Sequence, residues 1–206
     1  MSQSLVNAIE NKRPIKNIKN IIKKQNLNLK NTGSAKKTSP LHVAVKSRYK
    51  EAIELLLNLG SNVNITDAQG ETPLHKSVWF YDIVKMLLER GARVNVRDND
   101  GNSPLLSLMK VCGFINAKET LELLISYGAN IRQKNKTGFT ALHYAIDTCD
   151  TDIILYLIKQ GASVNAKSKE GHTPLTIALT NKMHGFVLSR YRSADDWDTI
   201  INALLK

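Results

Sequence analysis

A short pattern that recurs along the chain limits its fold more than any other feature. The pattern is Thr or Ser, then Pro or Ala, then Leu (Leu74 is one example), and in three of five copies His follows. Successive copies are separated by 33, 31, 37 and 33 residues and begin at Ser39, Thr72, Ser103, Thr140 and Thr173. A period of this size indicates stacked units that share one elongated core, because no single unit can bury its apolar face alone.

Glycines mark a second repeated feature. Leu-Leu or Leu-Ile, two further residues and a glycine recur in four units, and another glycine follows ten residues later each time, at Gly60/Gly70, Gly91/Gly101, Gly128/Gly138 and Gly161/Gly171. The first glycine of each pair is predicted to end a helix in the left-handed conformation. Thr72 and Pro73 suit the start of a preceding short helix, as cap and first helical residue. All variation in length therefore falls between two helices of a unit.

Together these motifs resemble the ankyrin repeat, whose signature is Thr-Pro-Leu-His-x-Ala with a period of about 33 residues. The resemblance covers residues 38 to about 182 and implies an all-α solenoid of helix-turn-helix repeats joined by β-hairpin-like loops. We expect three parts: a basic, degenerate N-terminal capping repeat with its loop at 1–37, four repeats at 38–172, and a C-terminal capping repeat at 173–206.

Both ends depart from the repeat pattern. In residues 3–30, Leu5, Val6 and Ile9 indicate one helix, and the isoleucines between Ile15 and Ile22 indicate a second. Residues 31–37 read as a loop. In the last repeat an insertion at about 182–195 delays the second helix, and it predicts a longer first helix or an extra short one. Ser193, followed by acidic residues, is typical of a helix start.

Two internal repeats depart in length. The second repeat is two residues shorter than the usual 33, around Trp79-Phe80-Tyr81, and the third is four residues longer, around 111–118. Three consecutive aromatic residues near a helix end cannot all face one core, since neighbours on a helix differ by about 100° in direction. Trp79 is therefore either an interface anchor or a filler of the space left by the deletion. Phe139, beside the turn at Gly138, carries the same two interpretations.

Net charge is concentrated at one end. The chain carries 29 basic and 18 acidic residues, a net charge of +11. Residues 1–37 hold nine basic residues and Glu10, a net +8, which leaves +3 for residues 38–206. This basic segment predicts either a solvated polar face of a terminal repeat or binding of nucleic acid or anionic membrane. It lacks aromatic residues between the lysines, and Lys dominates over Arg. We call its six basic residues in and between the expected helices the basic patch: Lys12, Arg13, Lys16, Lys19, Lys23 and Lys24.

Catalytic chemistry finds no support in the sequence. His42, His75 and His143 occupy one position of the repeat, and units about 10 Å apart cannot share a metal through them. We expect these histidines to bond backbone groups. Cys112 and Cys149, 37 residues apart, suggest reduced thiols in a cytosol-like compartment. No phosphate-binding glycine motif or metal-spaced cluster is present. We therefore expect no enzyme activity, metal or cofactor.

The resemblance implies a protein partner, bound in a concave groove made by hairpin tips and first-helix ends. By position this assigns partner contacts to Lys46, Ser47, Gln69, Glu71, Trp79, Phe80, Tyr81, Asn99, Asp100, Asn102, Lys110, Lys136, Phe139, Asp147, Lys169 and His172. It also implies candidate sites of asparaginyl hydroxylation at Asn64, Asn95 and Asn165.

The expected function is that of a non-enzymatic protein-protein interaction module, an adaptor, inhibitor or scaffold that is a monomer when alone. The abundance of Lys, Ile and Asn suggests an AT-rich genome, as in intracellular bacteria and large viruses with host-directed ankyrin proteins. The expected location is the cytoplasm of its own or a host cell, with the nucleus as an alternative.

Overall fold

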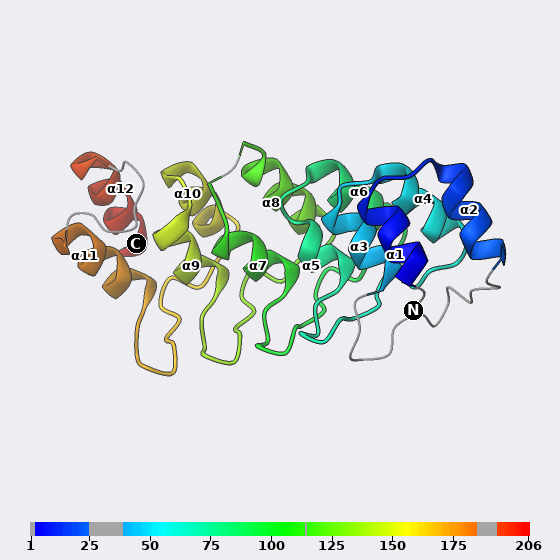
Figure 1. The fold of residues 1–206 in the computed structure, drawn as a ribbon. Helices are drawn as coiled ribbons and strands as arrows, with labels where there is room; N and C mark the ends of the chain where they lie inside the picture. Colours follow the sequence, from blue (N-terminus) through cyan, green and yellow to red (C-terminus); the bar gives the residue numbers. More distant parts are fainter. Residues whose placement is uncertain (1–2, 25–38, 114, 185–192) are drawn as a thin grey trace. The chain divides into compact units, whose positions relative to one another are not determined.

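The computed structural model describes residues 3–24, 39–113, 115–184 and 193–206. The chain divides into two compact units, Met1–Asn99 and Asp100–Lys206. The described residues form helices, turns and loops, with no strand among them (Figure 1). This confirms the all-α helix-turn-helix repeat expected from the sequence.

The first unit stacks three helix pairs. Its helices are α1 (Gln3–Glu10), α2 (Ile15–Lys24), α3 (Pro40–Lys46), α4 (Lys50–Asn58), α5 (Pro73–Ser77) and α6 (Tyr81–Glu89). The first helices α1, α3 and α5 pack in a row, and α2 packs beside α4. The helices α1 and α2 match the two helices expected in residues 3–30.

The second unit repeats this arrangement. It contains α7 (Pro104–Lys110), α8 (Ala117–Ser126), α9 (Ala141–Thr148), α10 (Thr151–Lys159), α11 (Pro174–His184) and α12 (Ala194–Leu204). Here α9 packs between α7 and α11, and α10 packs against α12. The extra residues of the third repeat lie between α7 and α8, at 111–116, as expected. The deletion in the second repeat instead shortens the first helix, since α5 spans five residues and α3 spans seven, and three residues follow each of them before the second helix.

A polar cap starts the first helices. The Thr72 hydroxyl accepts a hydrogen bond from the backbone N–H of His75, and the His75 ring accepts one from the backbone N–H of Thr72 (3.0 Å). This reciprocal capping box satisfies two backbone donors that a helix start leaves without an intrahelical partner. Thr140 and His143 form the same arrangement at α9. The predicted cap at Thr72-Pro73 is confirmed.

Three hairpin loops are closed by a polar side chain that bonds its own turn. Asp67 Oδ1 accepts hydrogen bonds from the backbone N–H groups of Gln69 and Glu71. At the corresponding positions of the second unit, Asn135 and Ser168 bond their own turns in the same way. The glycines that end the second helices, Gly60, Gly91, Gly128 and Gly161, have φ between 83° and 85°, as predicted.

Apolar side chains of both helices of each repeat form the core, with Leu41, Leu105 and Leu142 among those from first helices. The second helices contribute one face each. The residues that point inward recur three or four positions apart on each helix, which is the spacing of one helical face. They include Ile53 and Leu56, Ile83 and Leu87, Leu121 and Leu124, Ile153 and Leu157, and Ile200 and Leu204, all buried.

The C-terminal repeat has a long first helix. Helix α11 spans 11 residues, whereas the other first helices from α3 onward span five to eight. This agrees with one of the two expected forms of the insertion. Ser193 caps α12 in a capping box with Asp196, which confirms the predicted helix start. Residues 185–192 of the insertion, and the loop expected at 31–37, lie outside the described residues.

Candidate protein-binding surface

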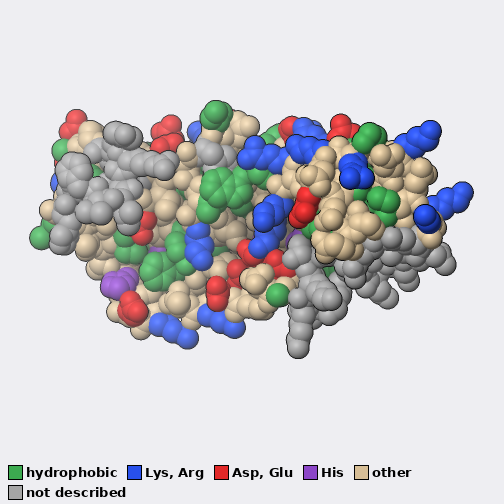
Figure 2. All heavy atoms as spheres, in the orientation of Figure 1, with side chains coloured by type: hydrophobic (Ala, Val, Ile, Leu, Met, Phe, Trp, Pro, Cys, Tyr) green, Lys and Arg blue, Asp and Glu red, His purple; other side chains and the backbone are tan. Residues whose placement is uncertain are grey.

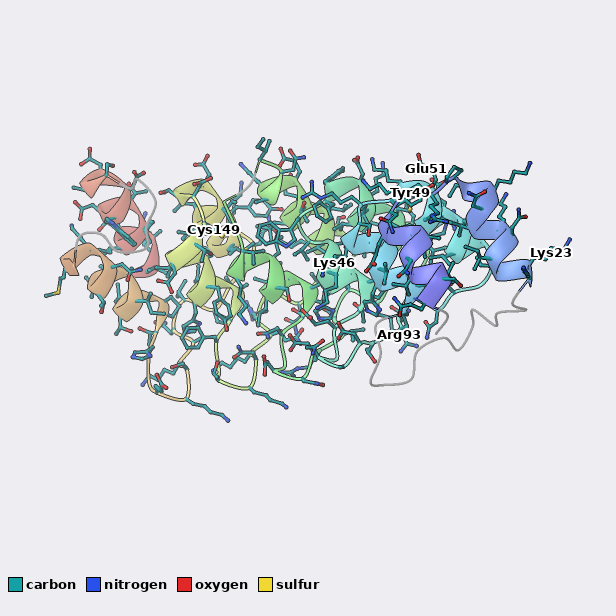
Figure 3. All side chains as sticks on the ribbon, viewed as in Figure 1. Lys23, Lys46, Tyr49, Glu51, Arg93 and Cys149 are labelled. Atoms are coloured by element: carbon teal, nitrogen blue, oxygen red, sulfur yellow. A yellow bond between two sulfur atoms is a disulfide. The ribbon has the colours of Figure 1, made fainter. Side chains whose placement is uncertain are left out.

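In the first unit, several predicted contact residues lie accessible on loops and helix ends. Lys46 is exposed at the end of α3 (Figure 3), and Gln69 and Asn99 are exposed at neighbouring hairpin tips. These tips are joined, because the Asn99 N–H donates to the Gln69 carbonyl oxygen (2.8 Å). Ser47 is half-buried, and half-buried Glu71 forms an ion pair with Lys76. The neighbouring hairpin loops of the first unit are thus held together and present polar side chains to solvent.

The three aromatic residues between α5 and α6 have different surroundings. Trp79 is 47% exposed. Phe80 is half-buried, and the Arg48 guanidinium lies over its ring at 3.9 Å from the centroid. Tyr81 is half-buried as the first residue of α6. The prediction that at least one of the three cannot be buried is therefore confirmed, and Trp79 is the exposed one.

In the second unit, the predicted contacts divide by accessibility. Exposed residues at the hairpin tips are Asp100, Lys136, Lys169 and His172, and Lys110 is exposed at the end of α7. Asp147 is half-buried and accepts a hydrogen bond from Asn181 (2.7 Å). Asn102 is only 2% exposed, and its side-chain oxygen accepts a hydrogen bond from Asn135. Because Asn102 links two hairpins inside the unit, we leave it out of the candidate surface.

Phe139 belongs to a small aromatic cluster that the sequence did not reveal. Its ring centroid lies 5.3 Å from that of Tyr144 and 5.0 Å from that of His143. The Tyr144 hydroxyl accepts a hydrogen bond from Asn135 (2.9 Å), and Lys110 lies over the Tyr144 ring at 5.4 Å. Tyr144 occupies the variable position of Thr-Pro-Leu-His-x-Ala. An aromatic residue at that position was the signal available in the sequence.

The repeated histidines have a structural role, as predicted. The His42 ring donates from Nε2 to the carbonyl oxygen of Glu71 (2.9 Å), while its Nδ1 accepts from the Ser39 hydroxyl (2.9 Å). His143 bonds His172 of the next hairpin in the same way (3.1 Å). Burial lowers the pKa of His42 from 6.5 to about 4, and it also lowers the pKa of His143. Both rings therefore stay neutral at pH 7.

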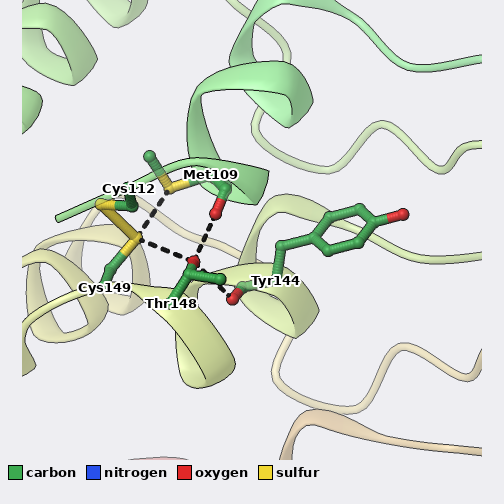
Figure 4. The surroundings of a disulfide bond; sticks show 5 residues. All are labelled: Met109, Cys112, Tyr144, Thr148 and Cys149. Carbon is green, nitrogen blue, oxygen red and sulfur yellow. Dashed lines mark hydrogen bonds between the residues drawn. A yellow bond between two sulfur atoms is a disulfide. The ribbon is translucent and has the colours of Figure 1, made fainter. Parts of the chain in front are cut away.

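The cysteines overturn one expectation. Cys112 and Cys149, predicted to be reduced thiols, form a disulfide with their Cα atoms 5.0 Å apart (Figure 4). Cys149 follows α9 directly, and α9 packs on α7, which ends two residues before Cys112. Cys149 Sγ also lies 3.8 Å from Met109 Sδ. A separation of 37 residues could not indicate this proximity, because it arises from packing of successive first helices.

All six residues of the basic patch are exposed: Lys12 and Arg13 lie between α1 and α2, and the four other lysines lie on α2. Lys23 projects from the end of α2 (Figure 3). Ile18 and Ile22 lie buried on the inner side of the same helix. The helix is thus amphipathic in the sense predicted, and its lysines are accessible to solvent or to a ligand.

The candidate hydroxylation positions lie where one repeat meets the next. Half-buried Asn64 donates from its amide to the Gly91 carbonyl oxygen (3.2 Å) and accepts from the Arg93 N–H (2.7 Å). Asn95 and Asn165 are exposed. Arg132, which replaces Asn in the fourth repeat, bonds the Gly161 carbonyl oxygen (2.8 Å) and so makes an equivalent link. Hydroxylation itself stays a prediction.

Within the described residues, no helix combines the length and apolar character needed to cross a membrane. The same residues contain no group of three or more His, Cys, Asp or Glu side chains placed to hold a metal ion.

Comparison with known proteins identifies the class. A family model for ankyrin repeats (3 copies) matches residues 5–98 and 108–188. The chain therefore belongs to the ankyrin-repeat family, whose members are generally non-enzymatic protein-protein interaction modules.

Similar proteins include human rabankyrin-5, 32% identical over 120 residues, and the chicken nuclear factor NF-kappa-B p105 subunit, 32% identical over 111 residues. These matches cover 58% and 53% of the chain but only 10% and 11% of the two relatives. The zebrafish Notch-regulated ankyrin repeat-containing protein A is 32% identical over 116 residues, covering 55% of the chain and 72% of that protein.

Proposed function

We propose that this chain binds a protein partner through its first-helix ends and hairpin tips, as an adaptor, inhibitor or scaffold. The observation that carries the proposal is the exposure of Trp79. A large aromatic side chain that is nearly half exposed, beside the Arg48–Phe80 contact, offers apolar area with little conformational freedom to lose. In the second unit Phe139 provides a comparable half-buried ring.

Affinity capture tests the proposal. The chain is used to capture proteins from its native cellular context, and mass spectrometry identifies them. We expect Trp79→Ala combined with Phe139→Ala to lose one or more partners that the unaltered chain retains. Tyr127→Ala is the matched control, because Tyr127 is 45% exposed but lies at the end of α8, a second helix. Retention of every captured protein by the double variant would contradict the proposal.

The basic patch supports a second candidate, binding of nucleic acid or anionic membrane. The observation in its favour is the exposure of all six basic residues, with Glu10 as the acidic residue of that segment. Changing Lys16, Lys19 and Lys23 to Glu would then abolish binding that falls steeply with salt. If the variant binds its ligand unchanged, this candidate is wrong.

A further inference from the structure

Two hairpin loops of the second unit carry lysines at the same two positions. Lys134 and Lys136 lie on the first loop, and Lys167 and Lys169 lie 33 residues later on the second. We call these four residues the lysine tip. In the first unit, the corresponding positions hold Thr66 and Ala68, and then Arg97 and Asn99. The lysine tip is therefore particular to this part of the chain and does not follow from the repeat itself.

Packing of the two loops brings the lysines onto one edge. The Lys169 N–H donates to the Thr137 carbonyl oxygen (2.9 Å), and Lys134 Nζ donates to the Lys167 carbonyl oxygen (2.9 Å). Within each loop the lysines flank one buried residue, Asn135 or Ser168, while all four are exposed. The buried residue of each loop bonds its own turn, and its two lysine neighbours remain accessible to solvent. Figure 2 shows Lys and Arg side chains at these loop ends.

Charge is distributed unevenly over the second unit. Residues 100–206 contain 12 basic and 10 acidic residues, a net +2. Loops 130–139 and 163–172 contain five basic residues and Glu170, a net +4, so the remainder of the unit carries a net −2. Glu170 lies 3.5 Å from His172 Nδ1. A compact positive edge on an otherwise slightly negative unit is complementary to a short acidic stretch of a partner.

Apolar surface adjoins the positive edge. Phe139 ends the loop that carries Lys136, and Tyr144 contacts it from α9. Both rings are half-buried, and hydrogen bonding from Asn135 to the Tyr144 hydroxyl fixes their position. Rigid aromatic rings can bind an apolar side chain of a partner, and the exposed charges beside them can set the orientation of that partner.

We infer that the lysine tip binds an acidic segment of a protein partner, with carboxylates facing the lysines and an aromatic or aliphatic side chain on Phe139 and Tyr144. This inference rests on the proposed function, since it names the chemistry of the partner for one part of that surface. Each lysine offers a compact positive charge that can pair with a carboxylate in many orientations, whereas arginine imposes bidentate geometry.

Selection from a library of random short peptides displayed on phage tests the inference with the full chain. We expect enriched peptides to combine two or more Asp or Glu residues with one large apolar residue. Lys136→Glu combined with Lys169→Glu should weaken their binding roughly tenfold or more at low salt. The matched control is Lys118→Glu with Lys159→Glu, two exposed lysines on α8 and α10, which should leave binding unchanged.

Four outcomes would overturn the inference, and they differ in what they say of the proposed function. In the first, the enriched peptides lack acidic residues and no longer bind the Trp79→Ala variant. In the second, acidic peptides bind the Lys136→Glu/Lys169→Glu variant unchanged. Either result would keep the proposed function and exclude the lysine tip from the binding surface. A fluorescent oligothymidylate that binds more tightly than the acidic peptides, and is lost on charge reversal, would assign the tip to nucleic acid. Failure to enrich any peptide would count against both proposals.

Discussion

Reduction of the disulfide between Cys112 and Cys149 should destabilise the second unit. The bond ties loop 111–116 to the end of α9 across a sequence separation of 37 residues. In the chain-entropy model, cross-linking a loop of this length removes enough freedom from the unfolded chain to stabilise the folded state by about 4 kcal/mol. The native contacts of α7 with α9 do not depend on the bond, so reduction should leave the helices in place.

Urea unfolding in the presence and absence of a reducing agent measures this effect. We expect a clearly lower midpoint for the reduced protein, with the same helical circular dichroism before unfolding. A variant with Cys112→Ala and Cys149→Ala serves as the control, because its midpoint should not respond to the reductant. Two results together would refute the reasoning. The midpoint would be the same with and without reductant, and both cysteines would react with an alkylating agent in protein that had never been exposed to reductant.

Other predictions concern caps, turns and titration. The free energy of unfolding should fall as the pH is lowered from 6.5 to 4, by about 3 kcal/mol at pH 4 from His42 alone. The reason is that the pKa of His42 is lower in the folded protein, so the unfolded chain binds the proton first. Denaturation at several pH values should show a smaller loss for His42→Gln. Gly138→Ala should lower the free energy of unfolding, measured in urea, more than Gly171→Ala does. Both glycines have φ near +85°, but of the two only Gly138 has backbone close to the position of an added Cβ, with the Lys169 nitrogen at 3.0 Å. Ser193→Ala should lower stability by about 1 kcal/mol through loss of the α12 cap, and an unchanged thermal midpoint would contradict that role.

Local chemistry made the repeat architecture predictable. Thr72 as a helix cap, Gly91 as a left-handed helix end and Ser193 as the start of α12 each depend on residues within a few positions, and each was confirmed. Their physical requirements are readable from sequence because cap and turn geometries admit few residue types.

Features that depend on contacts between repeats were not predictable to the same degree. Asn102 was assigned to the partner surface by its place beside a turn, yet its bond to Asn135 buries it. The proximity of Cys112 to Cys149 likewise arises from packing of α7 on α9. A periodic sequence gives the average repeat, whereas the four-residue insertion in the third repeat and the lysines of the last two loops are properties of individual repeats.

The hydrogen bonds from buried His42 and His143 to the hairpins that follow them determine how the chain can be shortened. His143 lies in the first turn of α9, but its Nε2–H is satisfied by a carbonyl oxygen 29 residues later, at His172. A fragment that stops after α10 would keep both helices of the fourth repeat and still leave this donor without its acceptor, at a cost of about 1–3 kcal/mol where the donor stays shielded from water. The damage from such a cut thus reaches the first helix of the same repeat. Fragments intended to fold should therefore end after a hairpin, directly before the next Thr-Pro-Leu motif.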